Sequence, residues 1–161
     1  MIFVTVGSSS HGFDRILEVV DELKLEKEIN DKIIAQIGNS RYKPKKIEMA
    51  FKFKSWKEVN ELYKKADMII SHAGAGTIIT ALKYNKPIIC IPRLKEFGEH
   101  TDNHQLEIAN ALEKKKKILV ARNKNELLNC IKKVKMGWKP KKELKSTKVA
   151  KEVLKFLSKV Q

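Results

Sequence analysis

Short apolar segments alternate with amphipathic segments along the whole chain, and this alternation restricts its fold more than any other feature. The segments with strand character are residues 2–6, 33–38, 47–53, 68–70, 87–91 and 118–120. The segments with helical spacing of apolar residues are 13–25, 55–65, 77–84, 102–115, 124–134 and 141–160. Continuously apolar strands separated by helices are typical of a parallel sheet covered on both faces. The pattern therefore predicts a doubly wound, mostly parallel α/β fold.

The length of the chain sets the number of domains. Its 161 residues suit one globular domain, which we expect to span residues 1–161. No apolar run approaches the roughly 20 residues that cross a bilayer, and residues 1–7 read as a first strand rather than a signal peptide. Cys90 and Cys130 lie far apart and have no metal-site spacing, which indicates a reducing, cytoplasmic compartment.

The charge of the chain is strongly positive. Lys and Arg number 34 against 19 Asp and Glu, a formal net charge of +15. Such an excess favours polyanions: nucleic acid, an anionic membrane face or phosphorylated ligands. It is also compatible with a lysine-rich surface that has no specific partner. Because the sequence holds no nucleic-acid motif or aromatic platform, specific nucleic-acid binding is the least favoured of these interpretations.

A glycine-containing loop between a strand and a helix is the strongest candidate for a ligand site. Its residues are Ser71, His72, Ala73, Gly74, Ala75, Gly76 and Thr77. Small residues there let a ligand approach the backbone, and the free N–H groups of a helix N-terminus bind phosphate. A steric need for glycine in a tight turn is the alternative. The loop lacks the glycine pattern of dinucleotide-binding folds and the Gly-Lys-Ser/Thr of phosphate-binding loops in nucleoside triphosphatases.

A polar loop over residues 92–105 is the second candidate. We expect Asp102 to cap the following helix, with Asn103, His104 and Gln105 in its first turn, where their side chains reach ligand hydroxyls. His100 and His104 are four residues apart and also suggest a metal site. His100 precedes the expected helix, so we favour hydrogen bonding to a ligand and expect no bound metal or other cofactor.

The loop over residues 7–12, after the first strand, is the third candidate. Gly7 and Ser8 are placed to contact a phosphate, and His11 is a candidate base. The alternative is a turn that only leads into the first helix.

Taken together, these segments resemble the C-terminal domain of glycosyltransferase family 28. The resemblance covers about residues 1–135 and is strongest for its free-standing members, which are catalytic subunits of dolichol-linked UDP-N-acetylglucosamine transferases and of bacterial exopolysaccharide glycosyltransferases. The segments that carry it are residues 3–7, 13–15, 66–77, 86–93 and 99–109, in the family's order and spacing. Arg93 belongs to one of them and is a candidate ligand residue.

The resemblance implies a Rossmann-like GT-B half-domain that binds a UDP-sugar and acts as an inverting, metal-independent glycosyltransferase. The transferred sugar is expected to be N-acetylglucosamine or another hexose. A membrane-associated partner subunit would hold a lipid-linked acceptor, with this chain peripheral at the cytoplasmic face. The helix near residues 139–161 would pack on its own domain or on that partner. The alternative to His11 as the base is a base supplied by the partner. A non-catalytic nucleotide-sugar-binding subunit and a basic nucleic-acid-binding protein are the rival functions.

One position departs from the family pattern. The family usually has a Glu three residues after the Thr of the glycine loop, where it is thought to hold the ribose hydroxyls. This chain has Thr80 there, which removes a charge-assisted acceptor. The departure implies weaker nucleotide affinity, compensation by another acid, or a function other than that of a standard UDP-sugar enzyme.

Overall fold

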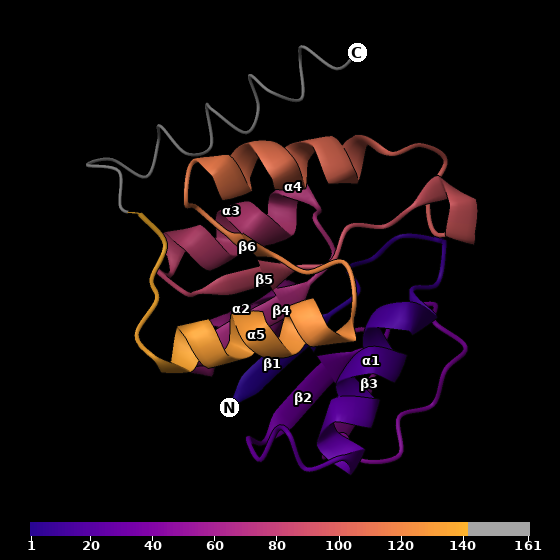
Figure 1. Ribbon diagram of the computed structural model, residues 1–161. Helices are drawn as coiled ribbons and strands as arrows, with labels where there is room; N and C mark the ends of the chain where they lie inside the picture. The colour runs from indigo at the N-terminus through magenta and orange to yellow at the C-terminus, as the bar shows by residue number, and fades with distance from the viewer. Residues whose placement is uncertain (142–161) are drawn as a thin grey trace.

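The computed structural model describes residues 1–141 and contains one six-stranded sheet in the order β3-β2-β1-β4-β5-β6 (Figure 1). Every neighbouring pair of strands is parallel. The strands are β1 (Ile2–Thr5), β2 (Ile33–Gln36), β3 (Met49–Phe51), β4 (Met68–Ser71), β5 (Ile88–Cys90) and β6 (Leu119–Val120). The predicted doubly wound α/β fold is confirmed.

Helices cover both faces of the sheet (Figure 1). The α-helices are α1 (Asp14–Leu25), α2 (Trp56–Lys65), α3 (Ala75–Lys83), α4 (His104–Lys114) and α5 (Lys124–Lys135), and a 3₁₀ helix η1 spans Lys95–Phe97. One core cluster joins α1 and α5 to the sheet, and the other joins α2, α3 and α4 to the opposite face. The two layers explain why most strands are apolar at every position: Ile2 and Val4 of β1 enter the first cluster, whereas Phe3 enters the second.

Several predicted boundaries are confirmed and others need correction. The capping box at the start of α2 is present, with Ser55 and Glu58 each bonding the backbone of the other. Helix α3 begins at Ala75, two residues before the predicted Thr77, because Gly74 is extended and serves as the N-cap. The prediction for α4 was wrong in detail. Asn103 is its N-cap, and Asp102 instead accepts the N–H of His104 at 3.0 Å.

Two findings concern the ends of the chain and the membrane. The predicted terminal helix over residues 141–160 falls almost entirely outside the described residues. Within residues 1–141, no helix combines the length and the apolar character that crossing a bilayer requires.

The strand order places a crevice at the carboxyl edge of the sheet. β1 lies between β2 and β4, so the order reverses between β1 and β4. The chain leaving β1 passes to α1 on one face, whereas the chain leaving β4 passes to α3 on the other. The two loops therefore diverge, and open α/β sheets bind ligands where such loops diverge.

A buried carboxylate fixes the loop before β3. Asp21 of α1 is 4% exposed and accepts the backbone N–H groups of Lys45, Lys46 and Ile47 and the hydroxyl of Tyr42. Burial alone would raise the pKa of Asp21, but these hydrogen bonds outweigh it and hold the pKa below its ordinary value. Burial, together with the hydrogen bond to Asp21, raises the pKa of Tyr42 to about 12.

We expect Asp21→Asn to lower the free energy of unfolding at neutral pH by about 2–4 kcal/mol, because a charged acceptor of several hydrogen bonds is lost. A carboxyl with a depressed pKa in the folded state stabilises above its unfolded pKa, near about 4, and this contribution is lost as the pH falls through the folded value. Urea unfolding of both proteins across this range should show their difference shrinking in acid. A difference that stays constant with pH would contradict the assignment.

Candidate functional site

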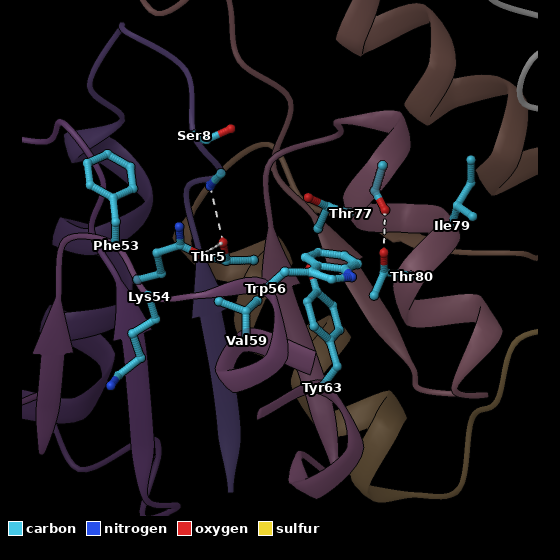
Figure 2. Close-up of a pocket in the computed structure, with 13 residues that line it drawn as sticks. Thr5, Ser8, Phe53, Lys54, Trp56, Val59, Tyr63, Thr77, Ile79 and Thr80 are labelled. Atoms are coloured by element: carbon cyan, nitrogen blue, oxygen red, sulfur yellow. Dashed lines mark hydrogen bonds between the residues drawn. The ribbon is translucent and has the colours of Figure 1, made fainter. Parts of the chain in front are cut away.

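A cleft of about 630 Å³ opens at the carboxyl edge of the sheet, beside the switch between β1 and β4 (Figure 2). Its walls come from the ends of β1 and β2, the loop after β3, α2 and the first turns of α3. The lining residues are Thr5, Gly7, Ser8, Gln36, Phe53, Lys54, Trp56, Val59, Tyr63, Gly76, Thr77, Ile79 and Thr80. Of the predicted ligand residues, Gly7, Ser8, Gly76, Thr77 and Thr80 thus meet in one cavity.

The N-terminus of α3 supplies the cleft with free donors. The first backbone bond within this helix is made by the N–H of Ile78 to Gly74 O, and Gly74 has no capping side chain. The N–H groups of Ala75, Gly76 and Thr77 have no hydrogen-bond partner among the described residues. A Cβ added to Gly76 would have no neighbour within 4 Å. An anion can therefore approach these donors directly, with support from the helix dipole.

The ring of His72 is packed between two glycines. A Cβ on Gly7 would lie 2.5 Å from this ring, and a Cβ on Gly74 would lie 2.2 Å from it. Gly7 also has a φ of +77°, which favours glycine. Burial, with the nearby charge of Arg93, lowers the pKa of His72 to about 4. His72 is therefore neutral at physiological pH and joins the two loops by packing.

Polar side chains shape the floor of the cleft and aromatic rings shape its side. The hydroxyl of Thr5 donates to Gln36 Oε1 at 3.0 Å and accepts the N–H of Gly7 at 3.1 Å. Trp56 and Tyr63 come from α2, and Phe53 from the loop after β3 (Figure 2). Trp56 is 66% exposed and Phe53 is 50% exposed. The cleft therefore combines aromatic surfaces that suit a flat ring with the polar first turns of α3.

Thr80 is buried at the rim of this cleft. Its hydroxyl donates to Gly76 O at 2.7 Å, so the oxygen can still accept a hydrogen bond from a ligand. No Asp or Glu is among the described residues that line the cleft. The sequence left open that another acid replaces the carboxylate missing at Thr80. The lining of this cleft gives no support for that possibility.

Arg93 is fully buried, at 0% exposure, and its donors are engaged by backbone carbonyls. Nη1 donates to His11 O, Gly12 O and Glu99 O, and Nη2 donates to Val6 O, at 2.8–3.1 Å. The guanidinium also lies over the ring of Phe13, 4.8 Å from its centroid. Nε has no partner among the described residues. In this structure Arg93 joins the loop after β5 to the loop after β1 rather than facing the cleft.

Gln105 likewise connects two loops. Its Oε1 accepts the N–H groups of Ala73 at 3.1 Å and Arg93 at 3.2 Å, and the residue is 8% exposed. Because both partners are donors, the side-chain atom that they contact must be the amide oxygen, Oε1. The amide nitrogen, Nε2, has no partner among the described residues. Its proposed contact with a donor sugar remains a prediction, now assigned to Nε2.

We expect Gln105→Ala to lower the free energy of unfolding by about 1–3 kcal/mol, since two buried N–H groups lose their acceptor. It should also weaken UDP-sugar binding more than UDP binding. Chemical denaturation and calorimetry would measure both effects. Asn103→Ala is the control for stability, because the side chain of Asn103 is exposed and accepts only the N–H of Lys95. Equal stability of the two variants would contradict the view that Gln105 stabilises the fold through its two buried hydrogen bonds.

The remaining residues of the second loop lie apart from the cleft. Asp102 forms ion-pair contacts with His100 at 3.1 Å and with His104 at 3.7 Å. Among the described residues, no group of three His, Cys, Asp or Glu side chains has the arrangement of a metal site. Asn103 and His104 do not line the cleft, so their contact with a ligand stays a prediction.

His11, the candidate base, lies on the other side of the loop after β1. It lines a second pocket, of about 660 Å³, together with residues of α1 and the loop after β5. The structure therefore separates the predicted set into a cleft beside α3 and a pocket beside α1, with residues 7–12 as the dividing loop.

Sequence reasoning missed the side of the cleft formed by Gln36, Phe53, Trp56 and Tyr63. A usable signal was present, because β2 and β3 also end at the carboxyl edge, where ligands of such sheets bind. Phe53 and Trp56 follow β3 directly and are apolar residues in an otherwise polar segment.

Comparison with protein families gives a match over nearly the whole chain. The Glycosyltransferase family 28 C-terminal domain matches residues 1–160. Human UDP-N-acetylglucosamine transferase subunit ALG13 is 34% identical over 123 residues, which are 70% of this chain and 10% of the human protein. The Candida albicans protein of the same name is 46% identical over 66 residues, 41% of this chain and 20% of that protein. The chain thus spans only a small part of these relatives.

Solved structures share the fold. A solution structure of ALG13 has a TM-score of 0.66 and 20% identity, with 94% of each chain covered. The calicheamicin glycosyltransferase CalG4 has a TM-score of 0.55 and 12% identity, with 99% of this chain and 43% of CalG4 covered. The chain therefore has the architecture found in part of larger glycosyltransferases.

Proposed function

Since the chain belongs to glycosyltransferase family 28, we propose that it is the donor-binding catalytic subunit of a two-part UDP-sugar glycosyltransferase. The family supplies the class of reaction, and the cleft supplies the residues. Subunits of UDP-N-acetylglucosamine transferases among its relatives favour N-acetylglucosamine as the sugar, with another hexose as the alternative.

The observation that carries the proposal is the uncapped N-terminus of α3 at the side of the cleft. Its free N–H groups suit the diphosphate of UDP, and the open space at Gly76 leaves room for it. The aromatic rings in the lining, those of Phe53 and Trp56, offer surfaces that suit the uracil ring. Gln36 and Thr80 offer hydrogen bonds to the ribose.

The proposed reaction needs stabilisation of a leaving group and a base. The acceptor oxygen bonds to the anomeric carbon from the face opposite the diphosphate, the bond from that carbon to the diphosphate oxygen breaks, and UDP leaves with the electron pair. The α3 donors bind the leaving diphosphate more strongly as its charge grows, which lowers the barrier without requiring a metal. The acceptor proton passes to His11 or to a base of the partner.

The relatives support a partner, because they are named subunits of UDP-N-acetylglucosamine transferases. GT-B enzymes close two domains around their substrates, and the fold described here corresponds to part of one such structure. We propose that a membrane-associated subunit supplies the second domain and the lipid-linked acceptor, at the cytoplasmic face of the membrane. The net charge of +15 favours association with an anionic surface.

A non-catalytic nucleotide-sugar-binding subunit is the second candidate. Thr80, and the absence of a carboxylate among the described residues of the cleft, favour it, because a ribose held without a charged acceptor is bound less tightly.

A transfer assay decides between the two. The purified chain alone is expected to transfer little sugar from UDP-N-acetylglucosamine to a lipid-linked acceptor, and addition of the acceptor-binding subunit should restore transfer. A Gly76→Val chain, added with the same partner, is the control and should be inactive. Binding of UDP without transfer in the complete system would favour the non-catalytic function, and robust transfer by the chain alone would contradict the need for a partner.

A further inference from the structure

The second pocket, beside α1, has a composition unlike that of the nucleotide cleft. Its lining residues are Ser10, His11, Gly12, Asp14, Arg15, Glu18, Asn39, Arg41, Phe97, Gly98 and Glu99. Nearly all of them are polar, and Phe97 is the one large apolar side chain among them. The pocket borders the same loop as the cleft, because Gly7 and Ser8 line the cleft whereas Ser10 and His11 line the pocket.

The two walls of this pocket are joined to each other by hydrogen bonds of arginine side chains. Nη1 of Arg93 donates to His11 O and Gly12 O of one wall and to Glu99 O of the other. Arg15 forms two further bonds to the Glu99 carboxylate, from Nε to Oε1 at 2.8 Å and from Nη2 to Oε2 at 2.7 Å. A buried network of this kind holds the pocket open in one shape before any ligand arrives.

Several polar side chains of the pocket are available to a ligand. Ser10, His11, Glu18 and Arg41 form no side-chain hydrogen bond or ion pair with any described residue. Asn39 is held in place because its Nδ2 donates to Ser9 O at 2.8 Å, which leaves its Oδ1 as an acceptor. The pocket thus offers both hydrogen-bond donors and hydrogen-bond acceptors, as the hydroxyls of a sugar require.

Phe97 provides a fixed aromatic surface at the edge of the pocket. Arg15 lies 5.1 Å from the centroid of its ring and holds it, yet Phe97 remains 60% exposed. An exposed ring held beside polar groups suits the face of a sugar, which carries C–H groups between its hydroxyls.

The charge of the pocket gives no preference for a phosphate. The carboxylates of Asp14, Glu18 and Glu99 are balanced by the guanidiniums of Arg15 and Arg41 in the lining and of Arg93, which bonds both walls. A pocket whose charges balance suits a neutral polar ligand.

We propose that this pocket binds a neutral sugar unit of the acceptor, so that this chain holds part of its acceptor as well as its donor. The proposal rests on the proposed function, because it assigns the acceptor side of the same transfer. It places the accepting sugar across residues 7–12 from the donor diphosphate, and His11 within the wall that the sugar contacts.

Nuclear magnetic resonance of the ¹⁵N-labelled full chain tests the assignment. With UDP present at saturation, the chain is titrated with cellobiose and with methyl N-acetyl-β-glucosaminide. We expect the sugars to shift the amide signals of Ser10–Gly12, Asn39–Arg41 and Phe97–Gly98. Phe97→Ala should weaken the sugar response about tenfold, the effect of one or two lost contacts, and leave UDP affinity unchanged. Met136→Ala, at an apolar residue that is 88% exposed and outside both cavities, is the matched control and should change neither.

The outcomes separate this proposal from the proposed function. If UDP shifts the cleft signals and the sugars leave the pocket signals unmoved, the pocket assignment is overturned and the donor function stands. The assignment also fails if these amide signals respond to a partner subunit and not to a sugar, because the pocket is then a protein interface. If UDP shifts no cleft signal, the proposed function is overturned.

Discussion

Gly76→Val is expected to weaken nucleotide binding strongly while the protein stays folded. The valine side chain would occupy the space through which a phosphate approaches the N–H groups of α3. An added Cβ there has no neighbour within 4 Å outside the backbone of α3, so we expect the fold to accept it. Loss of two or more hydrogen bonds to a charged ligand amounts to about 3 kcal/mol, or roughly a hundredfold in affinity for UDP. Calorimetry with UDP and a melting curve measure the two parts of the prediction.

Gly74→Val is the matched comparison two residues earlier. A Cβ there would lie 2.2 Å from the ring of His72, so the variant should lose stability as well as binding. A folded Gly76→Val protein that binds UDP as tightly as the unchanged chain would show that the diphosphate does not lie on α3.

Arg93→Met is expected to give the largest loss of stability of any substitution considered. Four carbonyl oxygens would lose their donor inside the protein, and Glu99 would lose a neighbouring positive charge. Removing one member of a buried charged network costs about 3–5 kcal/mol. For a protein of this size, we expect the melting temperature to fall by roughly 10 °C or more.

Arg122→Met is the control for this prediction. Arg122, like Arg93, has several hydrogen-bonding partners, among them the carboxylates of Glu113 and Glu126. Its side chain, however, is 47% exposed. Exposed ion pairs contribute about 1 kcal/mol or less, so Arg122→Met should scarcely alter the melting temperature. Similar losses in the two variants would contradict the view that Arg93 organises the loops. Arg93→Lys should behave like Arg93→Met, because a lysine ammonium cannot reproduce the planar set of donors.

The fold was predictable because most strands are buried on both faces and are therefore apolar at successive positions. Only β3, at the edge of the sheet, is more exposed, as its alternating sequence indicated. The ends of helices were less predictable, since they depend on local hydrogen bonds. Asp102, for example, was expected to cap α4. It accepts the N–H of His104 instead, and the N-cap of the helix is Asn103.

The site was predictable in part. Glycines between a strand and a helix identified the phosphate end, because the chemistry resides in the backbone. Arg93 and Gln105 looked like ligand residues because they lie in polar loops. Their partners are backbone groups, and for Arg93 these include carbonyls more than 80 residues away. Sequence alone cannot bring such distant groups together, and it equally could not place Trp56 beside α3.

The proposed function requires that the isolated chain bind UDP. Melting curves would be recorded with UDP, UDP-N-acetylglucosamine, UDP-glucose, GDP-mannose and NAD. A ligand at about 100 times its Kd adds about 2.7 kcal/mol to the native state, which should raise the melting temperature by roughly 5–10 °C. We expect this rise for UDP and UDP-sugars in the presence of a chelator, and its loss in Gly76→Val. No rise with any uridine nucleotide, or an equal rise with NAD, would contradict it.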